Sequence, residues 1–263
     1  MSTSMGQLRT ETDGGIRWIS IDNPARLNAF TRDMWDAVAT HFSAAERDPA
    51  VKVVVFRGAG EKAFSAGADI TEFSGNRTGS AVQEYDEINH RAFMSVLNCA
   101  KPTIAMVHGY AFGGGCEIAI CCDLRLAADD ALFSIPAAKL GLGYNARWIR
   151  PMLGVMSASK AKEMLFTARR YNAVQAMTMG LVNEVHPKAH LEAATRALAS
   201  EIAANAPLTI AAAKGAIDEM TARPETGDLA KLDRLVDACF ASADYAEGQR
   251  AFIEKRKPLF TGK

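Results

Sequence analysis

Hydrophobic and polar positions follow two different periods in the first part of the chain. Residues 7–12 and 16–21 alternate on either side of Asp13-Gly14-Gly15, which predicts a β-hairpin. Over residues 31–47 the apolar positions recur every three or four residues, which predicts a helix with one buried face. A continuous apolar run over 51–56 then predicts a strand that is buried on both faces.

The alternation of strands and helices continues through the middle of the chain. Further apolar runs predict strands at 103–107, 124–128, 132–135 and 181–185. Amphipathic patterns predict helices at 83–97, 145–153, 157–166 and 173–179. Two segments lack either period and predict loops, a Gly, Ser and Asn-rich one at 73–82 and a second one at 137–144.

Helical patterns dominate the end of the chain. From residue 188 the pattern predicts several amphipathic helices with breaks at Pro207 and Pro224. One of them carries an apolar stripe that is typical of packing within the chain or against a second subunit: Leu229, Leu232, Leu235, Val236 and Phe240. We therefore predict two regions, a mixed α/β core over 1–200 that holds the site and a helical region over 201–263.

The densest candidate chemistry lies at 108–123. The strand predicted at 103–107 leads into Gly113-Gly114-Gly115, and a short apolar helix beginning near Gly115 carries Glu117. Glycines at a strand-to-helix junction allow close approach of a bound group, and the free N–H groups of the first helical turn present partial positive charge. The junction is therefore suited to hold an oxyanion.

Glu117 is the unusual residue of this helix. Three and four positions away on either side the sequence places only glycine or apolar residues, so no opposite charge lies within helical reach. Burial without a charged partner favours the protonated carboxyl, which suits a group that gives and takes protons near neutral pH. The alternative is a glutamate at the solvent edge of an ordinary core helix.

Composition narrows the class of partner. Thirty basic and thirty acidic residues leave no net charge, which disfavours nucleic acid or an anionic membrane as the main partner. The five cysteines are odd in number and lack the paired C-x-x-C spacing of zinc sites. We therefore expect them to be reduced residues of the core. No apolar run approaches about 18 residues and the start lacks a signal-like segment. We expect a soluble, cytoplasmic protein that acts on a small ligand.

Two other motifs indicate chemistry only weakly. Gly58-x-Gly60 after a strand imitates a dinucleotide-binding fingerprint, but 64–68 prolongs a non-helical segment where that fingerprint needs a helix. The pair His186 and His190 has HxxxH spacing without an evident third ligand, so we predict no metal site. Neither a G-x-S-x-G elbow nor a phosphate-binding P-loop occurs.

Four segments taken together resemble the enoyl-CoA hydratase/isomerase (crotonase) superfamily. They are residues 23–29 (NPARLNA), 64–70 (FSAGADI), 109–117 (GYAFGGGCE) and 244–258 (DYAEGQRAFIEKRKP), so the resemblance covers nearly the whole chain. It implies an α/β fold, a crotonase-like spiral of repeated ββα units with a helical C-terminal oligomerisation region. It also implies a homo-trimer or hexamer.

The resemblance further implies a site for a CoA thioester. The backbone N–H groups of Ala68 and Gly114 would form an oxyanion hole beside Glu117 as acid and base. Coenzyme A enters as part of the substrate, with no prosthetic group. The resemblance places its adenine and pantetheine near Arg26, Leu27, Ala66, Asp69 and Ile70, and a C-terminal contact at Phe252 and Lys255.

One position departs from the family pattern. Hydratases of the family carry a second glutamate directly after a proline in the loop at 137–144, whereas this chain has Ala137. The same loop ends in Tyr144-Asn145, which resembles methylmalonyl-CoA decarboxylases. We expect a hydratase or isomerase that uses Glu117. The alternatives are a decarboxylase-like enzyme using Tyr144 and a non-catalytic CoA-binding relative.

Overall fold

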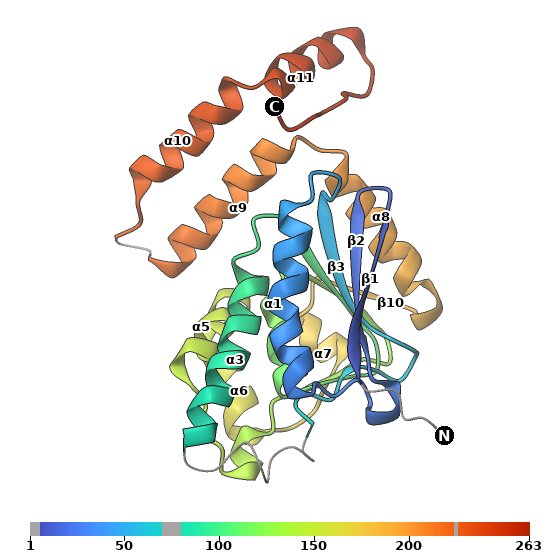
Figure 1. Cartoon of the computed structure of the whole chain (residues 1–263), viewed down its shortest axis with the longest axis vertical. Coiled ribbons are helices and arrows are strands. Elements are labelled where there is room, and N and C mark those ends of the chain that lie inside the picture. The colour runs from blue at the N-terminus through green and yellow to red at the C-terminus, as the bar shows by residue number, and fades with distance from the viewer. Residues whose placement is uncertain (1–5, 70–79, 224–225) are drawn as a thin grey trace.

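The computed structural model describes residues 6–69, 80–223 and 226–263. Its centre is a six-stranded sheet of order β1-β2-β3-β5-β7-β10 (Figure 1). The strands are β1 Gln7–Asp13, β2 Ile16–Asp22, β3 Val53–Gly58, β5 Thr103–Val107, β7 Leu124–Ala128 and β10 Glu184–His186. β1 and β2 form the predicted antiparallel hairpin, and all the other pairings in this sheet are parallel.

The strands β3 and β5 are buried on both faces, which explains their largely apolar sequences. On β3, Val53 and Val55 pack with the helix α8 (Leu191–Ala203), whereas Val54 and Phe56 face the helices α1 (Arg32–Arg47) and α3 (Ser80–Leu97). Figure 1 shows α1 and α3 in front of the sheet and α8 at its other side. Thr31 caps α1, because its hydroxyl accepts a hydrogen bond from Met34 N.

A second, four-stranded sheet of order β4-β6-β8-β9 lies beside the first. Its strands are β4 Ala63–Ser65, β6 Tyr110–Phe112, β8 Leu132–Ser134 and β9 Tyr171–Asn172. The segment 64–68 is non-helical, as predicted, but it begins inside a strand, because Phe64 and Ser65 belong to β4. No helix begins at Gly58 or Gly60, since β3 ends at Gly58 and β4 begins at Ala63, in agreement with the rejection of a dinucleotide fingerprint.

The remaining core helices match the predicted ones within a few residues: α4 Gly114–Ile120, α5 Ala146–Val155, α6 Ala158–Thr167 and α7 Ala173–Thr178. Two predictions needed correction. The loop at 137–144 begins with a 3₁₀ turn, η3 (Ala137–Leu140), and the strand expected at 181–185 is β10, displaced toward the C-terminus. Leu181 and Val182 are apolar because they enter the core after α7. Of the loop predicted at 73–82, residues 73–79 lie outside the described residues, and α3 begins at Ser80.

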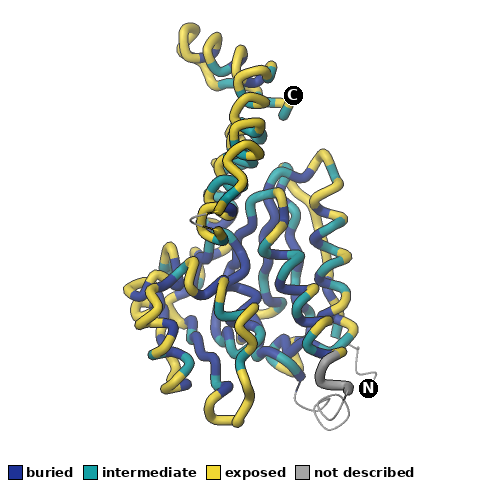
Figure 2. The backbone as a smooth tube through the Cα atoms, turned by 90° about the vertical axis from the view of Figure 1, so that its left-hand side faces the viewer, coloured by how far each residue is buried: buried dark blue, intermediate teal, exposed yellow. Residues whose placement is uncertain are grey.

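The C-terminal region contains α9 (Pro207–Ala222), α10 (Leu229–Phe240) and α11 (Ala243–Glu254). Pro207 starts α9, where its missing N–H costs nothing, and Pro224 lies outside the described residues. Figures 1 and 2 show these helices as a largely exposed arm that extends away from the sheets. The division at residue 200 stays a prediction.

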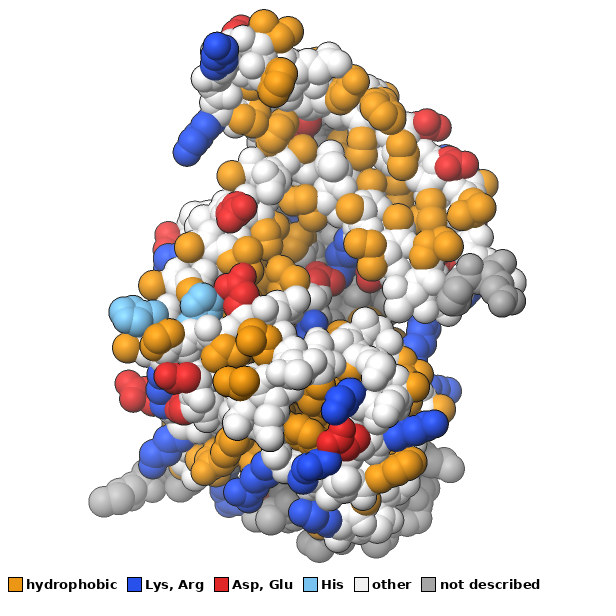
Figure 3. All heavy atoms as spheres, turned by 180° about the vertical axis from the view of Figure 1, so that it is seen from behind, with side chains coloured by type: hydrophobic (Ala, Val, Ile, Leu, Met, Phe, Trp, Pro, Cys, Tyr) orange, Lys and Arg blue, Asp and Glu red, His pale blue; other side chains and the backbone are white. Residues whose placement is uncertain are grey.

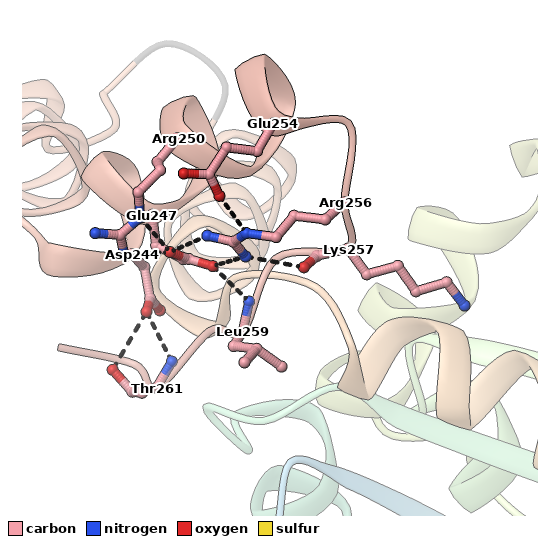
Figure 4. Close-up of polar contacts among 8 residues, drawn as sticks. All are labelled: Asp244, Glu247, Arg250, Glu254, Arg256, Lys257, Leu259 and Thr261. Atoms are coloured by element: carbon pink, nitrogen blue, oxygen red, sulfur yellow. Dashed lines mark hydrogen bonds and ion pairs between the residues drawn. The ribbon is translucent and has the colours of Figure 1, made fainter.

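Two carboxylates fix the tail of the chain onto this arm (Figure 4). Asp244 accepts hydrogen bonds from the backbone N–H groups of Thr261 and Gly262 at 2.7 and 2.8 Å. Glu247 accepts from the side chain of Arg256 and from the N–H of Leu259, at 2.6 and 3.0 Å. The last residues are thereby folded back on α11.

The cysteines behave as predicted. Cys99, Cys116, Cys121 and Cys122 are buried free thiols, and Cys239 is a half-buried one. Burial raises the pKa of Cys116 and Cys121 well above the ordinary thiol value, so these two stay neutral. Of the helices among the described residues, none combines the length and apolar character needed to cross a membrane.

Candidate active site

The first wall of the site is the junction between β6 and α4. Gly113 precedes α4, and its N–H donates to Ser134 O at 2.8 Å, which ties the junction to β8. A Cβ added at Gly115 would lie 2.5 Å from Ser65 O, so a side chain at this position would force α4 away from β4. Glycine at 115 therefore permits the two segments to touch.

The second wall is the segment that follows β4. Gly67 has φ +91°, and a Cβ there would lie 2.6 Å from Phe112 O and 3.2 Å from Gly114 N. The two segments predicted to supply the oxyanion donors are thus in direct contact at Gly67 and Gly114. They come from strands of the same sheet, since β4 pairs with β6 in parallel.

The backbone around Ala68 is held by Phe30. Gly67 O accepts from Phe30 N at 2.7 Å, and Asp69 N donates to Phe30 O at 2.9 Å. In a parallel bridge the residue between two bonded neighbours turns its own N–H and C=O away from the partner strand. The Ala68 N–H therefore points away from Phe30, and Phe30 fixes its orientation.

Glu117 lies on α4 and is 1% exposed. Burial raises the pKa of its carboxyl, and a hydrogen bond from Tyr144 offsets part of this rise, which leaves the pKa at about 8. The Tyr144 hydroxyl donates to Glu117 Oε2 at 2.6 Å. The other oxygen, Oε1, is buried and has no hydrogen-bond partner among the described residues. The predicted burial of this carboxyl is confirmed.

Tyr144 is fixed by aromatic packing. Its ring meets Trp148 of α5 edge to face at 5.6 Å, and Trp148 meets Phe93 of α3 in the same way at 6.0 Å. Burial and the nearby Glu117 raise the pKa of Tyr144 well above its ordinary value, so the phenol keeps its proton and acts as a donor. We call Tyr144, Trp148 and Phe93 the aromatic wall.

Comparison with known proteins identifies this architecture. Residues 11–263 match the family model described as enoyl-CoA hydratase/isomerase. The chain belongs to the enoyl-CoA hydratase/isomerase family.

The relatives match along nearly their whole length. The chain is 35% identical to a crotonyl-CoA hydratase of Syntrophomonas wolfei over 96% of this chain and 97% of that one. It is 33% identical to a short-chain-enoyl-CoA hydratase of Clostridium acetobutylicum over 94% of each chain. A crystal structure of an enoyl-CoA hydratase/carnithine racemase from Magnetospirillum magneticum superposes with a TM-score of 0.94 at 35% identity, covering 99% and 97% of the two chains.

At the second glutamate position of the family the structure has a buried methyl group. Ala137 opens η3, is 8% exposed and belongs to the main core. Nothing at this position can carry a proton. Within the loop at 137–144, the group that reaches Glu117 is the Tyr144 phenol.

Several residues predicted to contact CoA come together near the second wall. Leu27 O accepts from Ala66 N at 2.9 Å, and Leu27 has a left-handed backbone conformation with φ +52°. Arg26 lies 3.4 Å from the buried carboxylate of Asp69, so the cation is held beside the segment that carries Ala68. Ile70 lies outside the described residues.

Phe252 and Lys255 lie elsewhere in the chain. Phe252 lies in the last turn of α11 and Lys255 caps its end, in the arm that Figures 1 and 2 show extending away from the body. Phe252 is 86% exposed. Their role as CoA contacts stays a prediction, and within one subunit they are not brought to the segments around Ala68 and Glu117.

The aromatic wall was not predicted from the sequence. The helical pattern at 145–153 indicated α5, but Trp148 and Phe93 lie far apart in the chain, and no local pattern reports which residues of two helices meet. The first histidine of the HxxxH spacing is paired with a carboxylate. His186 Nε2 lies 2.7 Å from Glu184 Oε2, and the described ranges contain no group of three potential metal ligands.

Proposed function

We propose that this family member acts on an acyl-CoA thioester through an enolate held by the N–H groups of Ala68 and Gly114, with Glu117 as the proton carrier. The observation that carries the proposal is the buried carboxyl of Glu117 with its raised pKa, on the helix that begins at Gly114. A carboxyl with a pKa near 8 exchanges protons efficiently at neutral pH.

The N–H pair would act where negative charge develops. When a nucleophile adds to C3 of an enoyl thioester, the C2=C3 electron pair moves to the thioester oxygen and forms an enolate. Backbone donors aimed at that oxygen stabilise the transition state, and one such donor is typically worth about 2.7–4 kcal/mol. Phe30 holds Ala68 in a fixed orientation, so little reorganisation is needed during the reaction.

Hydration and isomerisation are the first candidate reactions, and the names of the relatives support them. In hydration, Glu117 takes a proton from water as the oxygen bonds to C3, and the same carboxyl returns a proton to C2. In isomerisation, Glu117 removes a proton from C4 and delivers one to C2. Isomerisation needs one proton carrier, which suits a site with Ala137 at the second glutamate position, whereas hydration also calls for a second acid-base group and should be slower here.

Decarboxylation of a malonyl-type thioester is the second candidate, favoured by that same absence of a second carboxylate. Loss of CO₂ generates the enolate directly, and Glu117 would protonate it at C2. The hydroxyl of Tyr144 is bonded to Glu117, which favours a role through the carboxyl over direct contact with substrate. We therefore rank decarboxylation below hydration and isomerisation.

Coenzyme A would enter as part of the substrate, with no prosthetic group. Our candidates for contacts with the CoA portion flank the oxyanion segment: Arg26, Leu27, Ala66 and Asp69.

For the assembly we propose a homo-trimer or hexamer. Figure 3 shows hydrophobic side chains spread over the C-terminal arm, and Ile217, Leu229, Phe240 and Ile253 are each more than 60% exposed. A monomeric mass in solution at micromolar concentration would contradict the proposed trimer or hexamer.

The function can be tested with a panel of enoyl, 3-hydroxyacyl and malonyl CoA thioesters, read by mass spectrometry. We expect turnover of an enoyl or 3-hydroxyacyl member, and a loss of about 10²–10⁴ in turnover for Glu117→Gln. Glu219→Gln, on α9, is the matched control, because Glu219 is also buried and its change should leave turnover unchanged. Near wild-type rates for Glu117→Gln would remove this residue from the mechanism.

A further inference from the structure

Trp35, on α1, packs against the start of the helix that carries Glu117. Its side chain is buried, with 1% of the residue exposed. A Cβ added at Gly114 would lie 3.0 Å from Trp35 Cζ2 and 3.2 Å from Cη2, so the indole ring touches the backbone of the first turn of α4. A residue with a side chain at 114 would push this turn away from the ring.

The same indole ring supports the segment that carries Ala68. Trp35 stacks on Phe30, with the ring centroids 3.9 Å apart and the ring planes 16° from parallel. The backbone of Phe30 is bonded to Gly67 O and Asp69 N, on either side of Ala68. Trp35 therefore touches one donor segment directly and is one residue away from the other.

A third contact fixes the indole ring itself. Phe93 of α3 meets Trp35 edge to face, with the centroids 5.4 Å apart. Phe93 also belongs to the aromatic wall, whose Tyr144 donates a hydrogen bond to Glu117. Because protein interiors are close-packed, a ring held by three neighbours cannot shift without displacing them. One connected set of aromatic rings thus supports both donor segments and the proton carrier.

We propose that Trp35 is a positioning residue that sets where the N–H groups of Ala68 and Gly114 lie relative to each other. The inference rests on the proposed function, because it concerns the same oxyanion hole. Trp35 acts through Phe30 and Gly114 and contacts no reacting atom. A donor stabilises the enolate only when its N–H is aimed at the thioester oxygen, and a misplacement of about 1 Å can cost about 10²-fold in rate.

Trp35→Phe removes the contact with α4, because phenylalanine lacks the Cζ2 and Cη2 atoms that lie beside Gly114. The indole N–H has no hydrogen-bond partner among the described residues, so the change removes packing and no side-chain hydrogen bond. We expect kcat to fall about 10- to 100-fold while KM stays within about threefold. The pH midpoint of kcat/KM should keep its wild-type value, because Glu117 retains its bond to Tyr144.

The position of the donors can also be measured without turnover, from the carbonyl stretch of bound butanoyl-CoA in difference infrared spectra. This thioester has no double bond to hydrate, and an isotope label at its carbonyl separates the band from those of the protein. Hydrogen bonds to the oxygen weaken the C=O bond, so the band of the wild-type complex should lie at lower frequency than that of the free thioester. Trp35→Phe should reduce this shift at saturating thioester.

Trp18→Phe is the matched control. Trp18 is fully buried and its N–H is also unpaired among the described residues, but it packs in the cluster on the α8 side of the sheet. This variant should lose thermal stability and keep the wild-type kcat and carbonyl shift.

Gly114→Ala tests the same contact from the other side. It keeps the N–H and presses a methyl group against Trp35, so it should also reduce the carbonyl shift. Trp35→Phe leaves room for that methyl group. The double variant should therefore lose less of the shift than the sum of the two single losses.

A wild-type carbonyl shift in Trp35→Phe would overturn the inference, and so would equal losses in Trp35→Phe and Trp18→Phe. A raised KM with an unchanged kcat would also overturn it, because the effect would then lie in binding. If Trp35→Phe does not fold, a wild-type shift in Gly114→Ala would overturn it instead. A wild-type protein that does not bind butanoyl-CoA, or binds it without a shift, would remove the proposed oxyanion hole itself. The two failures are distinguishable, since one appears in the variants and the other in the wild type.

Discussion

Replacing Tyr144 by phenylalanine should shift the pH at which Glu117 titrates. The phenol donates to Glu117 Oε2 at 2.6 Å, and a hydrogen bond of this kind stabilises the carboxylate more than the carboxylic acid. Hydrogen bonds to charged groups are worth about 1.5–3 kcal/mol, which corresponds to about one to two pH units. The pKa of about 8 in the wild-type site should therefore rise to roughly 9–10 in Tyr144→Phe.

The other titratable groups around Glu117 do not obscure this effect. The thiols of Cys116 and Cys121 lie on or beside α4, and burial raises the pKa of both well above the ordinary thiol value. They stay neutral over the range in which Glu117 titrates. A change in the pH profile near pH 8 is therefore assigned to the Glu117 carboxyl.

The assay is the pH dependence of kcat/KM for the thioester that the panel identifies. If ionised Glu117 takes the first proton, kcat/KM rises with pH to a plateau above about pH 8 in the wild type, and the midpoint moves upward in Tyr144→Phe. Tyr171→Phe is the control, because Tyr171 is buried and its hydroxyl accepts from Arg169 instead of contacting Glu117. A midpoint that stays in place or moves downward would refute the assignment.

Three further predictions follow from the same geometry. Glu117→Gln should have nearly the wild-type free energy of unfolding in urea at pH 4.5 and should become more stable than the wild type toward pH 9. The native carboxyl retains its proton up to about pH 8, so the wild type loses on the order of 5 kcal/mol of unfolding free energy over that range. Parallel pH curves for the two proteins would contradict this. Ala137→Glu should increase hydration of crotonyl-CoA about tenfold or more by adding a second acid-base group, and an unchanged rate would show that this position does not limit the enzyme. Gly67→Ala should lower turnover and cost about 1–3 kcal/mol in thermal unfolding, because its Cβ would collide with Phe112 O, whereas Gly141→Ala, also at positive φ but in open space, should cost less and preserve turnover.

Long elements were predictable from the sequence because their patterns repeat. The bounds of β5 and β7 match the predicted strands, and α1 differs by one residue, since the two strands are mostly apolar and the helix shows several turns of one apolar face. The strands of the small sheet, such as β4 and β9, are two or three residues long and cannot display a period. Their existence depends on pairing with distant segments, which local patterns do not encode.

The sequence also predicted the local features of the site, but not its contacts between distant segments. Glycine spacing and the apolar surroundings of Glu117 indicated a buried carboxyl beside an anion-binding junction, and its burial and raised pKa agree. The contact with Tyr144, 27 residues away in sequence, was not predicted. It depends on how η3 and the start of α5 fold over α4, and a single sequence does not determine that packing.

A phenol, Tyr144, contacts Glu117 in a site where hydratases of the family have a second carboxylate, and this changes which proton transfers the site can carry out. Two carboxyls in one apolar site interact, so that one has a raised pKa and holds the shared proton while the other is ionised. One can then act as the acid and the other as the base. With Ala137 and a phenol whose pKa is raised, the site can hold no more than one negative charge, and Glu117 acquires that charge as the pH rises past about 8. In the reaction proposed above, each proton transfer would then pass through the one carboxyl of Glu117, whose Oε2 accepts a hydrogen bond from Tyr144. Such a site favours reactions in which the proton leaves and returns on the same face of the acyl group.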